Sequence, residues 1–168
     1  MGYSAPELLA KHHFLDSFDC GERALDDWLK RFARAAQASG SARVFVTTED
    51  GKTVAGFYAL AAAQIEPANA TARAIKGEPA NRPIPAVLLA RLAVDRAHQR
   101  KGVGRSLLQD AVLRCLQAAD AIGVRLVLAH AKHAAARAWY EQYGFEPSPT
   151  DPLHVMVLIK DLRAFAKR

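Results

Sequence analysis

The residues with the clearest potential for chemistry lie at 99–106, where Gln-Arg-Lys-Gly-Val-Gly-Arg-Ser follows an apolar run and precedes a helical pattern. The first amides of a helix have no partner within the helix, and the peptide dipoles add positive potential there. Gly102 and Gly104 would let a ligand approach the backbone without meeting a Cβ atom. These features favour a pyrophosphate-binding turn, to which Lys101 and Arg105 add positive charge.

A G-x-G pair alone is more often an ordinary turn between a strand and a helix, which needs glycine for its dihedral angles. Two other phosphate-binding motifs are disfavoured, because Leu107 stands where a dinucleotide-binding turn needs its third glycine, and no P-loop pattern is present. Cys20 and Cys115 have no metal-ligand spacing, and the histidines form no H-x-x-x-H pair. We therefore predict no metal site and no structural disulfide.

The turn needs a strand before it and a helix after it, and the sequence predicts both. Residues 86–94 form an apolar run, interrupted by Arg91, that is typical of a buried central strand. Apolar residues then recur at helical spacing from Gly104 to Gly123. A strand at 125–130, a helix at 133–143 and a strand at 153–159 complete an alternating order that favours an α/β layer with partly parallel pairing.

In the first third of the chain, the residue pattern predicts a helix followed by a hairpin. Apolar residues at helical spacing indicate one helix over 21–39, with Asp19 placed to cap its start and Gly40 to end it. Residues 43–48 and 53–65 are rich in β-branched and aromatic types, and Asp50-Gly51 between them is a tight-turn signal. We expect an antiparallel hairpin there.

Residues 66–85 contain several prolines and alanines and one glycine, which predicts a loop with room for one short helix. A connection of this length is usually functional or mobile, and the alternative is a disordered insertion. The 168 residues, 51% of them hydrophobic, suit a single domain over 1–168. The sequence shows no secretory signal or membrane-spanning segment, so we expect a cytoplasmic protein.

A formal net charge of +6 favours a polyanionic partner, either nucleic acid or a phosphorylated cofactor. The alternative is a solvated basic surface without a partner.

Three blocks in order along the chain resemble the GNAT family of N-acetyltransferases. The family signature Q/R-x-x-G-x-G/A is matched by Gln99–Gly104, the apolar Leu92-Ala93-Val94 precedes it, and Ala-Trp-Tyr140-x-x-Tyr-Gly-Phe follows at 138–145. The resemblance implies an α/β fold with a single mixed, mostly antiparallel sheet, a parallel central pair of strands and flanking helices.

The same resemblance implies acetyl-CoA as the co-substrate and assigns roles to particular residues. The backbone around Leu92, Ala93 and Val94 would hold the pantetheine arm, and the pyrophosphate would lie on Arg100, Lys101, Gly102, Val103, Gly104, Arg105 and Ser106. Tyr140 would face the thioester sulfur and act as the catalytic acid.

A narrower resemblance is to acetyltransferase toxins of toxin–antitoxin modules, which acetylate the amino acid on charged tRNA and so block translation. It rests on residues 18–29, 56–60 and 83–95; Trp139 departs from it, since relatives often carry Phe there. The resemblance implies an aminoacyl-tRNA acceptor, a homodimer, and a small antitoxin, for which a ribbon-helix-helix protein is one candidate type.

Reference pKa values fit this chemistry. A phenol with a pKa near 10 can protonate a thiolate whose pKa is near 8.5, and an α-amine near 7.7–8.0 is partly neutral at pH 7. A base is therefore not obligatory, and Glu66 is the one carboxylate candidate, with a solvated loop residue as the commoner interpretation.

For a tRNA acceptor, the basic residues expected along the phosphates are Lys30, Arg31, Arg34, Arg73, Lys76 and Arg82. Each could equally be a solvated surface residue. The alternative enzymes are acetyltransferases for a small amine, an antibiotic or a protein N-terminus, and the alternative from another class is a non-catalytic tRNA- or peptide-binding module.

Overall fold

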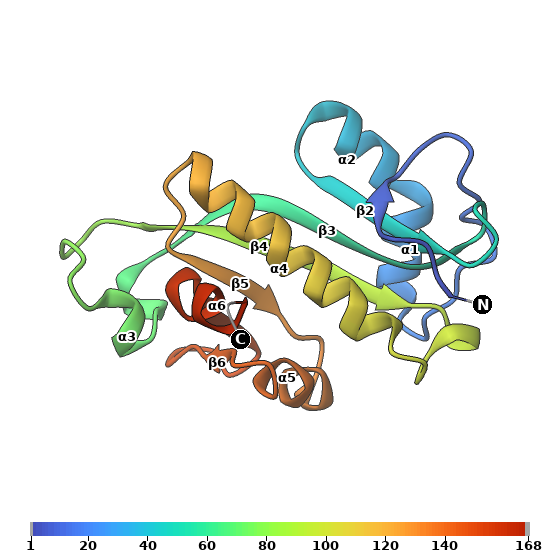
Figure 1. The fold of residues 1–168 in the computed structure, drawn as a ribbon. Helices are drawn as coiled ribbons and strands as arrows, with labels where there is room; N and C mark the ends of the chain where they lie inside the picture. Colours follow the sequence, from blue (N-terminus) through green and yellow to red (C-terminus); the bar gives the residue numbers. More distant parts are fainter. Residues whose placement is uncertain (1, 167–168) are drawn as a thin grey trace. The chain divides into compact units, whose positions relative to one another are not determined.

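The structure is a computed structural model that describes residues 2–166 (Figure 1). Its strands follow the order β1-β2-β3-β4-β5-β7-β6 in one sheet. The elements along the chain are β1 (Glu7–Leu8), α1 (Arg23–Arg31), α2 (Ala33–Ser39), β2 (Arg43–Thr48), β3 (Val54–Ile65), η1 (Pro67–Asn69), α3 (Ala72–Ile75), β4 (Ile84–Val94), η2 (Arg96–His98), α4 (Val103–Ala121), β5 (Leu126–His130), α5 (Ala134–Glu141), β6 (Glu146–Pro147), β7 (His154–Leu158) and α6 (Ile159–Ala166).

The sheet is mixed, and its parallel pair lies at the centre of the strand order. Residues 86–89 of β4 run parallel to residues 126–129 of β5, whereas β1–β2, β2–β3, β5–β7 and β6–β7 pair antiparallel. The predicted fold class is therefore confirmed. The predicted hairpin is also confirmed, since β2 and β3 pair from Arg43↔Leu60 to Thr48↔Val54.

The chain divides into two compact units, Met1–Ala61 with Arg91–Ala111, and Ala62–Ala90 with Val112–Arg168. β3, β4 and α4 each contribute residues to both units. Each unit is described by itself below. A single domain over residues 1–168 stays a prediction.

The core of the first unit forms on both faces of β3, because successive side chains of a strand point to opposite faces. Phe57 packs against Phe18, with ring centroids 5.5 Å apart, and stacks with Trp28 of α1 at 6.1 Å. On the other face, the Tyr58 hydroxyl donates a hydrogen bond to the Asp110 carboxylate of α4. This alternation fixes α1 on one face of β3 and the first half of α4 on the other.

Gly56 allows the start of α4 to approach β3 closely. A Cβ atom there would lie 2.9 Å from Leu107 Cδ1 and 3.3 Å from the Ala93 carbonyl oxygen. We expect Gly56→Ala to lower the free energy of unfolding by about 1–3 kcal/mol, because overpacking of this kind displaces backbone. Chemical denaturation measures the change. Gly123→Ala is the matched control: no atom lies within 4 Å of its added Cβ, so an equal loss there would contradict a packing cause.

The core of the second unit is a cluster on one face of β4, β5 and β7, covered by the segment that contains α3. Its buried members are Ala70, Ala74, Ile84, Ala86, Leu126, Leu128, Met156 and Leu158. Arg125 ties α3 to this core, because its Nε donates to the Ala74 carbonyl at 2.7 Å and its Nη2 to the Lys76 carbonyl at 2.9 Å. The Ser148 hydroxyl also donates to the Asn69 carbonyl, at 2.6 Å. Residues 66–85 are thus a packed segment with two short helices, not a disordered insertion.

The prediction of one helix over 21–39 is wrong. Helix α1 ends at Arg31 and α2 begins at Ala33, because Phe32 between them has φ −120° and ψ −23°, outside regular helical values. The Asp19 cap is wrong as well: Glu22 occupies the N-cap position without a side-chain cap bond. Asp19 instead accepts hydrogen bonds from the Gly21 amide and from Arg96 Nε. Gly40 ends α2, as predicted.

Candidate active site

The turn between β4 and α4 is held in shape by side chains of the first unit. Gln99 donates from Nε2 to the Val94 carbonyl at 2.8 Å and to the Cys20 carbonyl at 3.0 Å. Asp95 accepts from the amides of Ala97, at 2.9 Å, and Asp19, at 3.0 Å. The geometry of the turn thus depends on Gln99, the first residue of the motif, whose side chain links two backbone carbonyls.

Residues 100–106 span the turn before α4 and the first turn of that helix, where most backbone amides have no partner within the helix. Arg100 and Gly102 both have positive φ, 62° and 83°. Among the described residues of α4, Ser106 is the first whose amide donates to a backbone carbonyl, that of Gly102 at 3.1 Å. The preceding amides are therefore available to an anion at the positive end of a 19-residue helix.

A cavity of about 250 Å³ opens at this turn. Lys101, Gly102, Val103 and Ser106 form one wall, and Tyr3 to Pro6 with Thr47 form another. Lys101 and Arg105 are exposed, so their charges can reach an anion placed there. The turn has the space, the donors and the charge that a diphosphate group requires.

The end of β4 carries a residue whose importance the sequence did not reveal. Arg91 interrupts the apolar strand, and its guanidinium carbon lies 4.2 Å from the centroid of the Trp28 ring. Among residues 2–166 it has no carboxylate or hydrogen-bond partner, and burial lowers the pKa of its guanidinium. A partly desolvated cation without a counter-ion is suited to receive an anionic group of a ligand.

Tyr140 lies near the end of α5 in the second unit, with only 7% of its surface exposed. Its ring packs against Trp139 and Phe145, with centroids 5.0 Å and 5.3 Å away. Burial raises the pKa of the phenol well above 10, so the hydroxyl stays protonated at every physiological pH. Within residues 2–166 this hydroxyl has no hydrogen-bond partner, and its proton remains available to a ligand.

Neither cysteine has the properties of a nucleophile. Burial raises the pKa of Cys115 to about 12. Burial and a hydrogen bond with Asp26 raise the pKa of Cys20 to about 12. Both thiols are protonated at neutral pH, which disfavours a covalent acetyl-cysteine intermediate.

The six basic residues expected along tRNA differ in their surroundings. Lys30, Arg31, Lys76 and Arg82 are exposed. Arg34 is held by the protein itself, since its Nη2 donates to the carbonyls of His13, at 2.8 Å, and Ala10, at 3.2 Å. Arg73 forms a two-bond ion pair with Asp161 at 2.6 and 3.0 Å. Arg34 and Arg73 are therefore the weaker candidates.

One cluster has metal-ligand residue types, Glu7, His12 and His13, whose ligand atoms lie within 4.8 Å of one another. The hydrogen bonds of His13 oppose a metal there. Its Nδ1 accepts from the Ala10 amide at 2.9 Å, so the ring proton is on Nε2, which faces Glu7 Oε1 at 2.9 Å. A proton thus already occupies the position that a metal would need.

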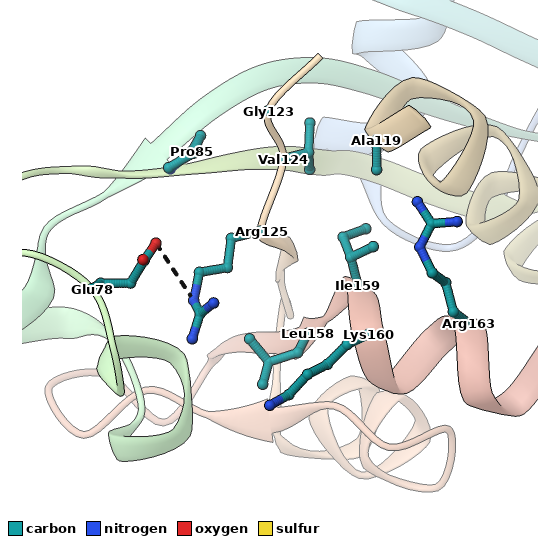
Figure 2. Close-up of a pocket in the computed structure, with 10 residues that line it drawn as sticks. All are labelled: Glu78, Pro85, Ala119, Gly123, Val124, Arg125, Leu158, Ile159, Lys160 and Arg163. Atoms are coloured by element: carbon teal, nitrogen blue, oxygen red, sulfur yellow. Dashed lines mark ion pairs between the residues drawn. The ribbon is translucent and has the colours of Figure 1, made fainter. Parts of the chain in front are cut away.

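Figure 2 shows a larger cavity in the second unit, of about 440 Å³, which also has cationic side chains in its wall. Two of its three cationic side chains are paired. Arg125 Nε lies 3.7 Å from Glu78 Oε1 and Arg163 Nη2 lies 2.6 Å from Asp120 Oδ1. This cavity is therefore the weaker anion site.

None of the described helices is long and apolar enough to cross a membrane.

The acetyltransferase (GNAT) domain family matches residues 40–147, a range that contains both the turn and Tyr140. The chain belongs to the GNAT acetyltransferase family, and it is an acetyl-CoA-dependent N-acetyltransferase.

The chain is also similar to individual toxins, in sequence and in fold. A tRNA-acetylating toxin of Mycobacterium tuberculosis (strain ATCC 25618 / H37Rv) is 50% identical over 163 residues, which are 97% of this chain and 96% of that protein. The structure of AtaT complexed with acetyl-methionyl-tRNAfMet matches with a TM-score of 0.88 at 24% identity, over 98% of this chain and 99% of that one. A mutant AtaT toxin bound to the C-terminus of the antitoxin AtaR and acetyl-CoA matches with a TM-score of 0.83 at 24% identity, over 99% of both chains. At these identities the two structures show a shared fold.

Proposed function

We propose that this enzyme transfers the acetyl group of acetyl-CoA to the α-amino group of aminoacyl-tRNA and thereby blocks translation. The observation that carries the proposal is the 50% identity, along 97% of the chain, to a tRNA-acetylating toxin. A net charge of +6 is consistent with a polyanionic acceptor.

The donor fits the turn of the first unit. The diphosphate would be held by the amides of the residues before Ser106 and by the Ser106 side chain, that is by Arg100, Lys101, Gly102, Val103, Gly104, Arg105 and Ser106. The backbone of Leu92, Ala93 and Val94 would hold the pantetheine arm. The cavity of about 250 Å³ beside Gly102 supports this assignment. The space next to the Gly102 backbone is open, since an added Cβ there meets no atom within 4 Å, so a diphosphate has room to approach it. Acetyl-CoA supplies the acetyl group as a thioester.

Tyr140 is the proton donor in this proposal. Its phenol holds one proton for the departing thiolate, and burial keeps that proton in place. Burial also makes the phenol a weaker acid in water. A thiolate that forms in similarly dry surroundings is a stronger base than in water, so the two pKa values rise together and the transfer remains feasible.

The acceptor tRNA would contact Lys30, Arg31, Lys76 and Arg82, which are exposed, with Arg34 and Arg73 as weaker contributors. Arg91 extends this set, because its guanidinium lacks a counter-ion among the described residues. Because charged tRNA is a cytoplasmic substrate, this acceptor supports a cytoplasmic location for the enzyme.

A flat dependence on salt would contradict a tRNA acceptor. Phosphate contacts release counter-ions, so log kcat/KM for charged tRNA should fall linearly with log salt, by about 0.7–0.9 per contact. A double variant Lys30→Gln, Arg31→Gln should reduce the magnitude of the slope by about 1–2. Arg163→Gln is the matched control, since Arg163 is paired with Asp120 and lies outside the proposed tRNA contacts, so its loss should leave the slope unchanged.

The acceptor itself is identified with labelled acetyl-CoA and a total pool of charged tRNA, followed by mass spectrometry of the released aminoacyl groups. Deacylated tRNA is the control, because it carries no α-amine. Label transferred to free amines or to protein N-termini, and not to charged tRNA, would support the alternative acetyltransferases.

The partner is proposed to be an antitoxin, as AtaR is for AtaT, and a ribbon-helix-helix type is one form it could take. We also propose a homodimer. Light scattering of the purified enzyme tests the dimer, and co-purification with the product of the adjacent gene tests the antitoxin.

A further inference from the structure

A third cavity, of about 220 Å³, belongs to the second unit and lies beside the end of β5. Two imidazoles and one carboxylate, those of His130, His154 and Glu66, are among its lining side chains. Glu66 is the carboxylate that the sequence offered as a base candidate. The two histidines were not recognised as a pair, because 24 residues separate them in the sequence and only the register of β5 with β7 brings them together.

His130 and His154 are direct cross-strand neighbours. Their rings stack with centroids 3.9 Å apart and planes inclined by 20°. His154 has an anionic partner, since its Nε2 lies 3.4 Å from Asp151 Oδ2. His130 has no hydrogen-bond or ion-pair partner among residues 2–166 beyond this stacking, and its ring is exposed to the cavity. One ring nitrogen lone pair of His130 is thus available to a ligand.

Three titratable groups surround His130: His154 on β7, Asp151 in the loop before β7, and Glu66 after β3. Desolvation by packing lowers the pKa of His130, repulsion from His154 lowers it further, and Asp151 opposes both. Two imidazolium rings in contact repel each other, and the carboxylate of Asp151 pairs with His154. His130 is therefore neutral, and able to accept a proton, at neutral pH.

We propose that this cavity receives the amino group of the acceptor and that His130 takes its proton. The proposal rests on the proposed function and adds a base that the sequence did not reveal. An α-ammonium group suits the cavity, because Glu66 contributes a negative charge to the wall and the His130 lone pair a hydrogen-bond acceptor. His130 is then a catalytic residue, and His154 a positioning residue that acts through it.

The protons balance as follows. The acceptor arrives as R–NH3⁺ and gives one proton to the neutral imidazole of His130. The nitrogen then bonds to the acetyl carbon, the carbon–sulfur bond breaks, and Tyr140 gives its proton to the thiolate. The second proton lost by the nitrogen passes through water and restores the Tyr140 phenol. His130 releases its proton to water, so each turnover frees one proton.

The test is the pH dependence of kcat/KM for the total charged-tRNA pool in wild-type and His130→Gln enzymes. With His130 as the base, the acid limb of the wild type lies below about pH 6.5, because the pKa of His130 is lowered from that value. In His130→Gln only the neutral amine reacts. The low-pH decline of kcat/KM then moves to the α-amine pKa of about 7.7–8.0. The variant should be about twentyfold slower than wild type at pH 6.5 and within about threefold at pH 8.5.

His154→Gln should move the wild-type limb upward, because the repulsion that lowers the pKa of His130 is lost. His12→Gln, an exposed histidine of the other unit, should move nothing. NMR titration of the imidazole signals gives the pKa of His130 without any turnover. An acid limb unchanged in His130→Gln, or a titration of His130 above about pH 6.5, would overturn the proposal. Wild-type enzyme that labels no charged tRNA would instead overturn the proposed function.

Discussion

Tyr140→Phe is expected to lower kcat by on the order of 10²- to 10⁴-fold while leaving the affinity for CoA nearly unchanged. The variant removes one hydroxyl and keeps the ring that packs against Trp139 and Phe145. Because that hydroxyl has no hydrogen-bond partner among residues 2–166, its loss should not unfold the protein. Single-turnover acetylation measures the chemical step, calorimetry with CoA measures the affinity, and thermal unfolding verifies the fold.

Tyr143→Phe is the matched control for this variant. Tyr143 is three residues away and packs against the same Trp139 ring, at 5.1 Å, but it is only half-buried. Its loss of a hydroxyl should leave turnover unchanged. A Tyr140→Phe enzyme with wild-type turnover would remove the acid assignment and leave water as the proton donor.

The pH profile adds an independent check on the same assignment. Burial raises the pKa of Tyr140 well above its ordinary value near 10, so the phenol stays protonated between about pH 8 and 10. A loss of activity between about pH 8 and 10 therefore cannot come from deprotonation of Tyr140. Suppose that wild-type activity falls between about pH 8 and 10 and that this fall is absent in Tyr140→Phe. The Tyr140 phenol would then have an ordinary pKa, and its hydroxyl would be exposed to solvent.

The local patterns of the sequence predicted most of the fold. Strands β2 to β5 and β7 and the helices α4 and α5 lie within a few residues of the expected ranges. Their periodic patterns are regular, and most of them are bounded by a glycine, proline or aspartate. The two-residue strands β1 and β6 and the final helix α6 were not expected. Pairing with β2 and β7 defines these strands, and no two-residue pattern encodes a partner.

Site residues that are contiguous in the sequence could be predicted, whereas those that only the fold brings together could not. Gln99 to Ser106 form one contiguous turn, so their residue types and spacing could favour an anion site, with an ordinary strand-to-helix turn as the alternative. Arg91 and Trp28 are far apart in the sequence, and their contact depends on α1 packing on the same face of the sheet as the Arg91 side chain. The break at Phe32 also escaped prediction, because the apolar spacing continues across it and only the backbone angles interrupt the helix.

A Gly102→Val enzyme is expected to bind CoA on the order of 10- to 100-fold more weakly. Gly102 has φ 83°, where a β-branched residue is a strong outlier and costs about 1–2 kcal/mol or more. The turn can escape this cost only by rotating its peptides, which turns the amides of the helix start away from a bound diphosphate. The valine side chain would also occupy space that is open in the native turn, since no atom lies within 4 Å of the added Cβ. Calorimetry with CoA measures the affinity.

Gly77→Val separates the backbone cost from the effect on binding. Gly77 has φ 81° and equally open surroundings, but it lies in the segment between β3 and β4, away in sequence from the turn. Both variants should lose similar stability in chemical denaturation, because both place valine at the same φ. Only Gly102→Val should lose affinity for CoA. If the two variants weakened CoA binding equally, the loss would follow from global destabilisation, and the backbone of residues 100–106 would not be the group that holds the diphosphate.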